Sequence, residues 1–472
     1  MTRVLVLTTE PLPFEGMETT GAGLRAWGLA KGLESSSLEV IPAMPFNAFR
    51  EKNVTDKNFS EDKNVFHRNR LTEFVNSVSP DVIVFQHWGM MRELEDVDIP
   101  IALDLHGPHL LERYYWERAR AKNKDNAALL NAQYEKNLAE KLRAFRRADF
   151  IVCAGKFQRR YFLPFLLMAG HNITDDTLPV VPFSLDPGVP EVNSENRDPE
   201  RFVYGGMFLP WQNPENPIQW TLESFDETEK GKLNFYGGAH PVEDVSGGRF
   251  QKLVKTLEQH ARVNIRGIVP SKTLEKEYLQ SSVALDLMGQ NPERELAFTS
   301  RTVFYLWCGL PVLYNNYSEI SELIAEYNAG WTFSPEDEAG FKQTVRNILN
   351  GKENLEEKRK NTARLIREKL NWNTAIKPLA EFCHDPYKRK QKTTVITPIE
   401  KRANRIATLE QTLSQKQSEL LTIRGKKAYK IAKKLSPLRW IGGIIIFLLS
   451  VPVSILFLLI TLLSDRIQKC NR

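Results

Sequence analysis

Residues 291–316 read NPERELAFTSRTVFYLWCGLPVLYNN, and this stretch decides the fold. Two acids come first, and Arg301 opens an apolar, aromatic run. Gly309 and Pro311 then interrupt the run, and 312–314 (VLY) has the composition of a short buried strand. Because glycine and proline after a helical run mark a stop and a turn, we expect a loop, a helix, a tight turn and a parallel strand.

This arrangement predicts a ligand site at the start of the expected helix. In open α/β sheets, ligands bind at the carboxyl ends of strands and at helix N-termini, where free N–H groups and the helix dipole favour anions. Arg301 would be available to a phosphate there, and Glu293 to hydroxyl groups.

Short apolar segments alternate with helical patterns along most of the chain, in two successive series. Buried parallel strands have this composition, so we predict an α/β fold with two doubly wound, Rossmann-like sheets that face a cleft. The segments of the first series are 3–8, 38–42, 81–86, 101–105 and 148–154, and those of the second are 202–206, 233–238, 263–267, 283–287, 312–314 and 330–333.

The first series contributes two features of a site. Gly21 and Gly23 open the first helix after a loop, and glycine lets the backbone come close to a ligand. His106 follows the segment 101–105, and residues just beyond the carboxyl end of a strand often carry the chemistry of such folds. A single histidine is as often structural, and His87 and His109 are weaker candidates than His106.

The opening stretch resembles the donor-site segment of GT-B glycosyltransferases of the family 4 type. It is most similar to a bacterial branch in which the segment reads roughly E-T-R-x-x-F-R-T-R-x-x-D-Y-L-W-A-G-L-P-V. The positions that match are Glu293, Phe298, Arg301, Tyr305, Leu306, Trp307, Gly309, Leu310, Pro311 and Val312.

Three further segments, within roughly residues 3–382, resemble the same branch. Residues 21–27 (GAGLRAW) are similar to its G-P-G-I-R-A-W, and residues 180–184 to a strand V-V-P-F-G that ends the first domain. Residues 205–214 (GGMFLPWQNP) are similar to G-G-x-x-x-W-x-D-P, with one residue more before the tryptophan. The resemblance implies transfer of a hexose-like sugar from a nucleotide-sugar donor, with retention and without a metal. It implies catalytic roles for His106 and Glu293, and donor binding by Gly21, Gly23, Arg25, Gly206, Gln212, Arg301 and Tyr305.

The chain departs from the family pattern at three positions. Phe304 replaces an acid that in the wider family lies near the ribose of the nucleotide. Met207 and Gln212 stand where many members have an arginine and a lysine for the diphosphate, so Arg301 and backbone N–H groups would carry more of that charge. These departures leave open a degenerate transferase domain that acts as a membrane scaffold. A sugar-nucleotide epimerase, which shares the fold, is a second alternative.

Composition excludes several other classes. The 472 residues contain four scattered cysteines without ligand spacing, which argues against a disulfide framework and structural zinc. Asp96-Val97-Asp98 resembles a metal-binding DxD, but we interpret it as part of a surface linker and expect no metal or other cofactor. The N-terminus enters a strand directly and lacks the layout of a signal peptide.

The basic charge is concentrated in the C-terminal tail. From Lys388 onward, 18 lysines and arginines face 4 acids, a net charge of +14, which leaves 46 basic and 54 acidic residues, or −8, in the rest. Nucleic-acid binding by the main body is therefore not expected, whereas a basic tail facing a membrane is.

The tail also contains an apolar segment. Ile399, Ile406, Leu413 and Leu420 repeat every seven residues, which favours an amphipathic helix or a short coiled coil that makes a homodimer. Residues 441–464 carry no charge, and as a helix they would be about 36 Å long, enough for a hydrocarbon core of about 30 Å. We expect this segment, as a single span or a hairpin, to hold the enzyme at the cytoplasmic face of the membrane, near a cell-surface glycan or lipid-linked acceptor.

These observations give five expected parts. The first domain is 1–185, on the acceptor side, and the second, 186–386, binds the nucleotide sugar. A basic linker (387–398), a basic amphipathic helix (399–439) and the hydrophobic anchor (440–464) follow.

Overall fold

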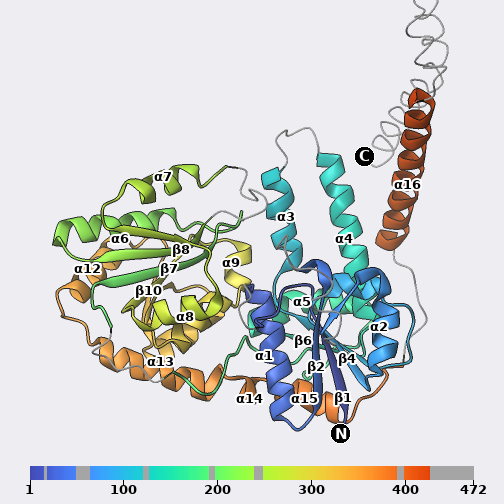
Figure 1. The fold of residues 1–472 in the computed structure, drawn as a ribbon, viewed down its shortest axis with the longest axis horizontal. Coiled ribbons are helices and arrows are strands. Elements are labelled where there is room, and N and C mark those ends of the chain that lie inside the picture. The colour runs from blue at the N-terminus through green and yellow to red at the C-terminus, as the bar shows by residue number, and fades with distance from the viewer. Residues whose placement is uncertain are drawn as a thin grey trace, which may run out of the picture. The chain divides into compact units, whose positions relative to one another are not determined.

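The computed structural model describes residues 1–14, 19–48, 64–120, 127–190, 197–238, 248–390 and 398–425. The chain divides into two units, Met1–Glu400 and Lys401–Arg472. Figure 1 shows two sheets in the first unit, each with helices on both faces. Each sheet has six strands in parallel register, which confirms the predicted α/β architecture with two parallel sheets.

The first sheet has the strand order β3-β2-β1-β4-β5-β6. Its strands are β1 (Arg3–Leu7), β2 (Glu39–Pro45), β3 (Val65–Phe66), β4 (Val82–Phe85), β5 (Ile101–Leu105) and β6 (Phe150–Cys153). The accompanying helices are α1 (Gly21–Ser35), η1 (Phe46–Ala48), η3 (Arg68–Arg70), α2 (Leu71–Val78), η4 (Trp88–Glu93), α3 (His109–Arg120), α4 (Ala127–Arg147) and α5 (Lys156–Met168). The short β3 has no counterpart among the predicted segments, because two residues are too few for a periodic pattern.

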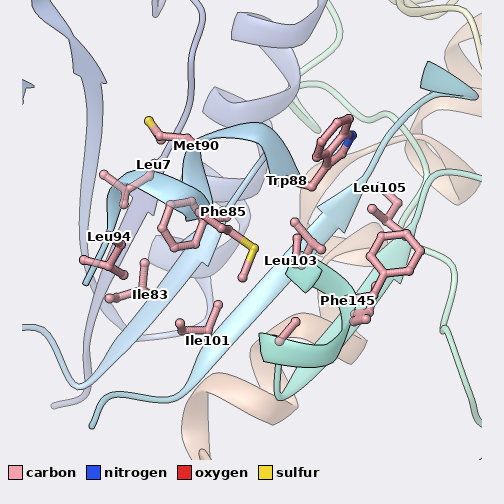
Figure 2. Packing of buried hydrophobic residues seen from close by; sticks show 14 of the residues in the cluster. Leu7, Ile83, Phe85, Trp88, Met90, Leu94, Ile101, Leu103, Leu105 and Phe145 are labelled. Carbon is pink, nitrogen blue, oxygen red and sulfur yellow. The ribbon is translucent and has the colours of Figure 1, made fainter. Parts of the chain in front are cut away.

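Alternate residues of β1 serve two different cores. Val4 and Val6 pack with residues of α1, whereas Leu5 and Leu7 pack with α2, α4 and α5 on the opposite face. Side chains alternate across a strand, so a sheet covered on both faces needs apolar residues at every position. Figure 2 shows part of the second core, with Phe85 and Leu103 of neighbouring strands among the packed side chains.

The second sheet has the order β12-β11-β10-β7-β8-β9. Its strands are β7 (Arg201–Met207), β8 (Lys232–Gly238), β9 (Val263–Gly267), β10 (Val283–Asp286), β11 (Val312–Asn315) and β12 (Gly330–Phe333). Its helices are α6 (Glu215–Thr228), α7 (Gln251–Gln259), α8 (Ser271–Leu279), α9 (Pro292–Leu296), α10 (Ser300–Trp307), α11 (Glu319–Tyr327), α12 (Glu338–Leu349) and α13 (Leu355–Lys369). The opening stretch thus forms α10, a turn with Gly309 at φ +71° and β11, as predicted, whereas the expected loop before them contains the short helix α9.

Two segments differ from their predicted places. Residues 180–184 form a single bridge from Val180 to Cys153 instead of a strand, because Pro182 has no N–H to continue the ladder. At the end of the predicted second domain, α14 (Trp372–Ala375) and α15 (Lys377–His384) return to the first sheet. Leu379 and Phe382 of α15 share a core with Val4 and Val6. The amphipathic pattern of these helices shows an apolar face but not which sheet it covers.

The second unit begins within α16 (Pro398–Gly425), which contains the predicted heptad positions. Leu413 and Leu420 are exposed on this helix. Within the described ranges, which end at residue 425, no helix has the length and apolar character needed to cross a membrane. The predicted anchor, 440–464, and most of the basic segment before it lie outside the described residues.

Candidate active site

Arg301 lies at the carboxyl edge of the second sheet, held by groups from three elements. It is the second residue of α10, and its Nη1 donates to Oδ1 of Asp286, the last residue of β10, at 3.1 Å. The guanidinium carbon lies 5.1 Å from the ring centre of Tyr204 on β7. The Arg301 side chain is 16% exposed, so it is a largely desolvated cation with one remaining open side.

Asp286 is the buried partner of this cation. Its Oδ2 also accepts a hydrogen bond from the Thr302 hydroxyl at 2.6 Å. Burial raises the pKa of Asp286, and the charge of Arg301 opposes that rise. Sequence reasoning missed Asp286, although its position at the end of an apolar segment is one where functional side chains are expected.

Gly206, near the end of β7, touches the Arg301 guanidinium. Its φ of +133° lies in a region that residues with side chains rarely adopt, and an added Cβ would lie 2.3 Å from Arg301 Nη2. Tyr305, one turn further along α10, is fully buried, and its hydroxyl accepts from the Gly205 N–H at 2.6 Å. Tyr305 therefore joins α10 to β7 beside Arg301, which favours a positioning role, and the direct donor contact implied by the resemblance stays a prediction.

The predicted donor-loop residues lie next to the same guanidinium. The buried Gln212 amide, oriented by its hydrogen bonds, donates to the Met207 carbonyl at 2.8 Å and accepts from Arg301 Nη2 at 3.3 Å. Phe304 is half-buried and stacks on Trp307, with ring centres 5.9 Å apart. An aromatic ring cannot accept hydrogen bonds from a ribose as a carboxylate does, so Phe304 changes the chemistry of that position.

Glu293 on α9 is buried and forms a bidentate pair with its neighbour Arg294, at 2.6 and 2.9 Å. Burial raises the pKa of Glu293, Arg294 opposes the rise, and the Glu112 carboxylate adds to it. Glu112 belongs to α3, so carboxyl groups that flank the two sheets act on one another. Arg294 was not predicted, because a charged residue beside Glu293 is equally compatible with an exposed helix.

His106, directly after β5, is held by Gln86, which directly follows β4. Its Nδ1 lies 3.1 Å from the Gln86 carbonyl oxygen, and the Gln86 amide nitrogen lies 3.3 Å from its Nε2. Burial lowers the pKa of His106 well below its usual value, and the nearby His109 lowers it further. The ring is therefore neutral at pH 7. Its Nδ1–H donates to the Gln86 carbonyl, and its Nε2 accepts from the Gln86 amide, a partner that a ligand hydroxyl could replace.

His109, given less weight from sequence, lies at the centre of the histidine group. Its ring centre is 4.7 Å from that of His106 and 4.8 Å from that of His87. Its Nδ1 is 2.9 Å from Glu112 Oε2, and its buried Nε2 has no hydrogen-bond partner within the described ranges. The only sequence signal for the His109–Glu112 pair is its i, i+3 spacing at the start of a helix.

Three residues predicted to line the donor site make internal contacts. Arg25 is buried and bonds Asp104 through two nitrogens, at 2.7 and 2.6 Å, and the carbonyl of Val181. An added Cβ at Gly21 would lie 2.2 Å from Ser300 Oγ, and one at Gly23 would lie 2.1 Å from the Pro11 carbonyl oxygen. These glycines allow α1 to approach α10 and its own preceding loop, and Arg25 positions the strand that leads to His106.

The remaining site features are a pocket and the acidic DxD segment. A pocket of about 400 Å³ at the carboxyl edge of the first sheet is lined by Thr9, Glu10, Arg68, His87, Gly89 and Arg92. In the part of the chain that the structure describes, no three histidine, cysteine or acidic side chains are grouped to hold a metal ion. Asp96 and Asp98 are exposed, and Asp98 pairs with Lys388 at 3.1 Å.

The comparisons with known proteins agree with this architecture. No family model matches the sequence, and no curated protein matches it significantly. Sucrose-phosphate synthase from Thermosynechococcus elongatus is similar in structure, with 12% identity and a TM-score of 0.55 over 81% of this chain and 98% of that one. Trehalose-6-phosphate synthase OtsA has 10% identity and a TM-score of 0.54 over 82% of this chain and 100% of its own. Anabaena HepE in complex with UDP-glucose has 11% identity and a TM-score of 0.54 over 81% of this chain and 100% of its own. At this identity the likeness shows the fold alone: the chain has the GT-B fold.

Proposed function

We propose that this protein is a glycosyltransferase of the family 4 type, which moves a sugar from a nucleotide-sugar donor to a glycan or lipid-linked acceptor with retention. The fold supports a sugar transferase, because the similar structures include two sugar-phosphate synthases and a protein with bound UDP-glucose. A fold alone does not specify an activity, so the proposed reaction depends on the residues of the site.

The observation that carries the proposal is the arrangement around Arg301. A largely desolvated guanidinium stands at the carboxyl edge of a parallel sheet and at the start of a helix, packed against a glycine that has no side chain to displace it. Asp286 and the Gln212 amide fix its orientation. A fixed guanidinium in a dry site binds phosphate oxygens through paired N–H groups, so Arg301 suits a departing diphosphate.

The proposed mechanism is mainly electrostatic. As the bond between the anomeric carbon and the diphosphate oxygen breaks, the electron pair moves to the diphosphate, and Arg301 and backbone N–H groups stabilise the negative charge. The Glu293–Arg294 pair fixes a carboxylate that stabilises the positive charge developing on the sugar. His106, as a neutral imidazole, accepts a hydrogen bond from a sugar hydroxyl through Nε2 in place of the Gln86 amide.

The cellular setting is proposed from the tail. The uncharged residues 441–464, preceded by seven basic residues in 424–439, favour an anchor with the enzyme on the cytoplasmic face. The heptad positions of α16, exposed at Leu413 and Leu420, favour pairing with a second copy. A membrane-bound enzyme suits an acceptor that is itself held at the membrane.

A second candidate function, a donor-free scaffold, rests on Phe304. This side chain stacks on Trp307 where the family has an acid near the ribose. A sugar-nucleotide epimerase is disfavoured only by the proposed anchor.

The transferase activity is tested with full-length protein in detergent micelles and a panel of nucleotide sugars, with water as the acceptor. The measurement is the release of UDP, GDP or ADP. We expect one donor to be hydrolysed, and Glu293→Gln to lower the rate about 100-fold, because it removes a charge that acts in the transition state. The matched control is Glu295→Gln on the same helix, whose exposed carboxylate accepts from the Gln290 amide at 2.8 Å. Hydrolysis of no donor by folded protein would favour the scaffold, whereas epimerised sugar without acceptor-dependent transfer would favour the epimerase.

A further inference from the structure

The pocket beside His87 has a chemistry of its own. It lies where the first sheet opens, with Thr9 and Glu10 after β1 and His87 after β4. Arg68 and Arg92 complete its charged lining, and its volume of about 400 Å³ is in the range of small-molecule pockets. Its lining is mainly polar, which fits a hydroxylated or charged ligand better than an apolar one.

The two arginines are oriented by acids that do not line the pocket. Arg68 Nε donates to Glu93 at 2.8 Å, and Arg92 Nη1 donates to Glu140 at 3.1 Å, with Glu93 3.8 Å from Arg92 Nε. Among the described residues, the terminal nitrogens of Arg68 and the Nη2 of Arg92 have no hydrogen-bond partner. Both guanidiniums therefore keep free N–H groups, which can form strong, charge-assisted hydrogen bonds with carboxylate or phosphate oxygens.

His87 adds a neutral donor to this set. Its Nδ1 accepts from the Gly89 N–H at 3.0 Å. Burial holds the pKa of His87 well below its usual value, and nearby charges that include Arg68 lower it further, so the ring stays neutral. A neutral imidazole whose Nδ1 accepts must carry its proton on Nε2, which makes Nε2–H a donor.

Glu10 is the exception in a lining rich in donors. Its carboxylate already accepts from the Thr20 hydroxyl at 3.1 Å and keeps further capacity to accept from a ligand hydroxyl. The lining thus offers two cations and a neutral donor against one carboxylate. This balance fits a sugar that has both hydroxyl groups and a negative charge.

A chain of side-chain interactions leads from the pocket to the proposed reaction centre. The His87 ring lies 4.8 Å from His109, His109 pairs with Glu112, and the Glu112 carboxylate acts on Glu293. A ligand in the pocket would therefore lie on the first-sheet side of the donor site, where an acceptor is required.

We propose that this pocket binds the acceptor as an anionic saccharide, with Arg68 and Arg92 on its carboxylate or phosphate group and Glu10 on a hydroxyl. The inference rests on the proposed function, whose acceptor it specifies. A carboxylate and a phosphate share the chemistry that a guanidinium recognises, so the two sources are separated by the choice of probe.

Calorimetric titration of full-length protein in detergent micelles with glucuronic acid, glucose 6-phosphate and glucose tests the inference. At least one acidic sugar should bind about tenfold more tightly than glucose, since a hydrogen bond to a charged group contributes about 1.5–3 kcal/mol. Tighter binding of glucuronic acid would identify a carboxylate, and tighter binding of glucose 6-phosphate a phosphate. Arg68→Gln and Arg92→Gln should each abolish most of the preference.

Arg70→Gln is the matched control, because Arg70 lies on the same short helix η3, is mostly exposed and does not line the pocket. Equal binding of all three sugars, or equal losses in Arg70→Gln and Arg68→Gln, would overturn the inference. The donor panel, titrated into the same preparations, separates the two proposals. Donor binding without a preference for acidic sugars contradicts the acceptor assignment alone, whereas a preference for acidic sugars without donor binding contradicts the transferase.

Discussion

Arg25 on α1 and Asp104 on β5 form a buried, bidentate ion pair, with Nε–Oδ2 and Nη2–Oδ1 distances of 2.7 and 2.6 Å. Asp104 Oδ2 also lies 3.8 Å from His106 Nδ1. Burial raises the pKa of Asp104, and the charge of Arg25 opposes the rise. The pair thus joins α1 to β5, the strand that precedes His106.

We predict that Arg25→Ala lowers the free energy of unfolding by about 3–5 kcal/mol, because it leaves the Asp104 carboxylate buried without its partner. The double variant Arg25→Leu/Asp104→Leu should recover much of that loss, since it removes both charges. Thermal unfolding of the two proteins makes the comparison. A double variant less stable than Arg25→Ala would show that the pair is not coupled as described.

Gly206→Ala should weaken donor binding by more than tenfold while the protein stays folded. The new Cβ would lie 2.3 Å from Arg301 Nη2, so the guanidinium must move from its place beside Asp286. Gly351→Ala is the matched control, because Gly351 also has a positive φ, +68°, but an added Cβ meets nothing within 4 Å. Both variants carry a backbone cost of about 1–3 kcal/mol for a side chain at positive φ, and only the first should change calorimetric donor affinity. Equal affinities in the two variants would contradict the contact.

Lys141 on α4 predicts a dependence of stability on pH. Its Nζ is buried and has no hydrogen-bond partner within the described ranges. It lies 4.7–5.9 Å from the centres of five aromatic rings: Trp88, Phe145, Tyr161, Phe162 and Phe165. Burial lowers the pKa of Lys141 from 10.5 to about 7, opposed by the charge of Glu112.

Between these two pKa values the unfolded chain binds a proton that the folded protein lacks, so stability rises with pH from about 7 to about 10.5. Lys141→Met should remove this contribution, about 1.4 kcal/mol for each pH unit in that range at most. Unfolding midpoints measured across the range, wild type against Lys141→Met, provide the check. Parallel curves for the two proteins would show that Lys141 has an ordinary pKa.

The sequence predicted the elements better than their partners. Residues 291–316 specified α10, the turn at Gly309 and β11, because the hydrophobic period and the glycine-proline break are local properties. It also indicated Arg301 as a cation at a strand edge. It could not show that Asp286 and Gln212 hold this cation, because Asp286 lies 15 residues before Arg301 across a turn and Gln212 belongs to another βα unit.

Residues that look like ligand contacts can have structural roles in the fold. Arg25 and Tyr305 both match the family motifs, yet their polar atoms bond Asp104 and Gly205. His109 was given little weight because one histidine in a helix start carries no pattern, and its pairing with Glu112 depends on how α3 begins. Packing decides which polar residue faces a ligand, and a linear motif does not contain that information.

Donor calorimetry on full-length wild type, Arg301→Gln and Arg346→Gln measures whether Arg301 holds the diphosphate of a nucleotide sugar. Arg346 is the control, an arginine on α12 paired with Glu227. We predict that wild type and Arg346→Gln bind the same nucleotide sugar equally. Arg301→Gln should bind it about 30- to 150-fold more weakly, because it loses a charge-assisted hydrogen bond of about 2–3 kcal/mol. Folded Arg301→Gln that binds as tightly as wild type, or wild type that binds no UDP-, GDP- or ADP-sugar, would contradict the claim.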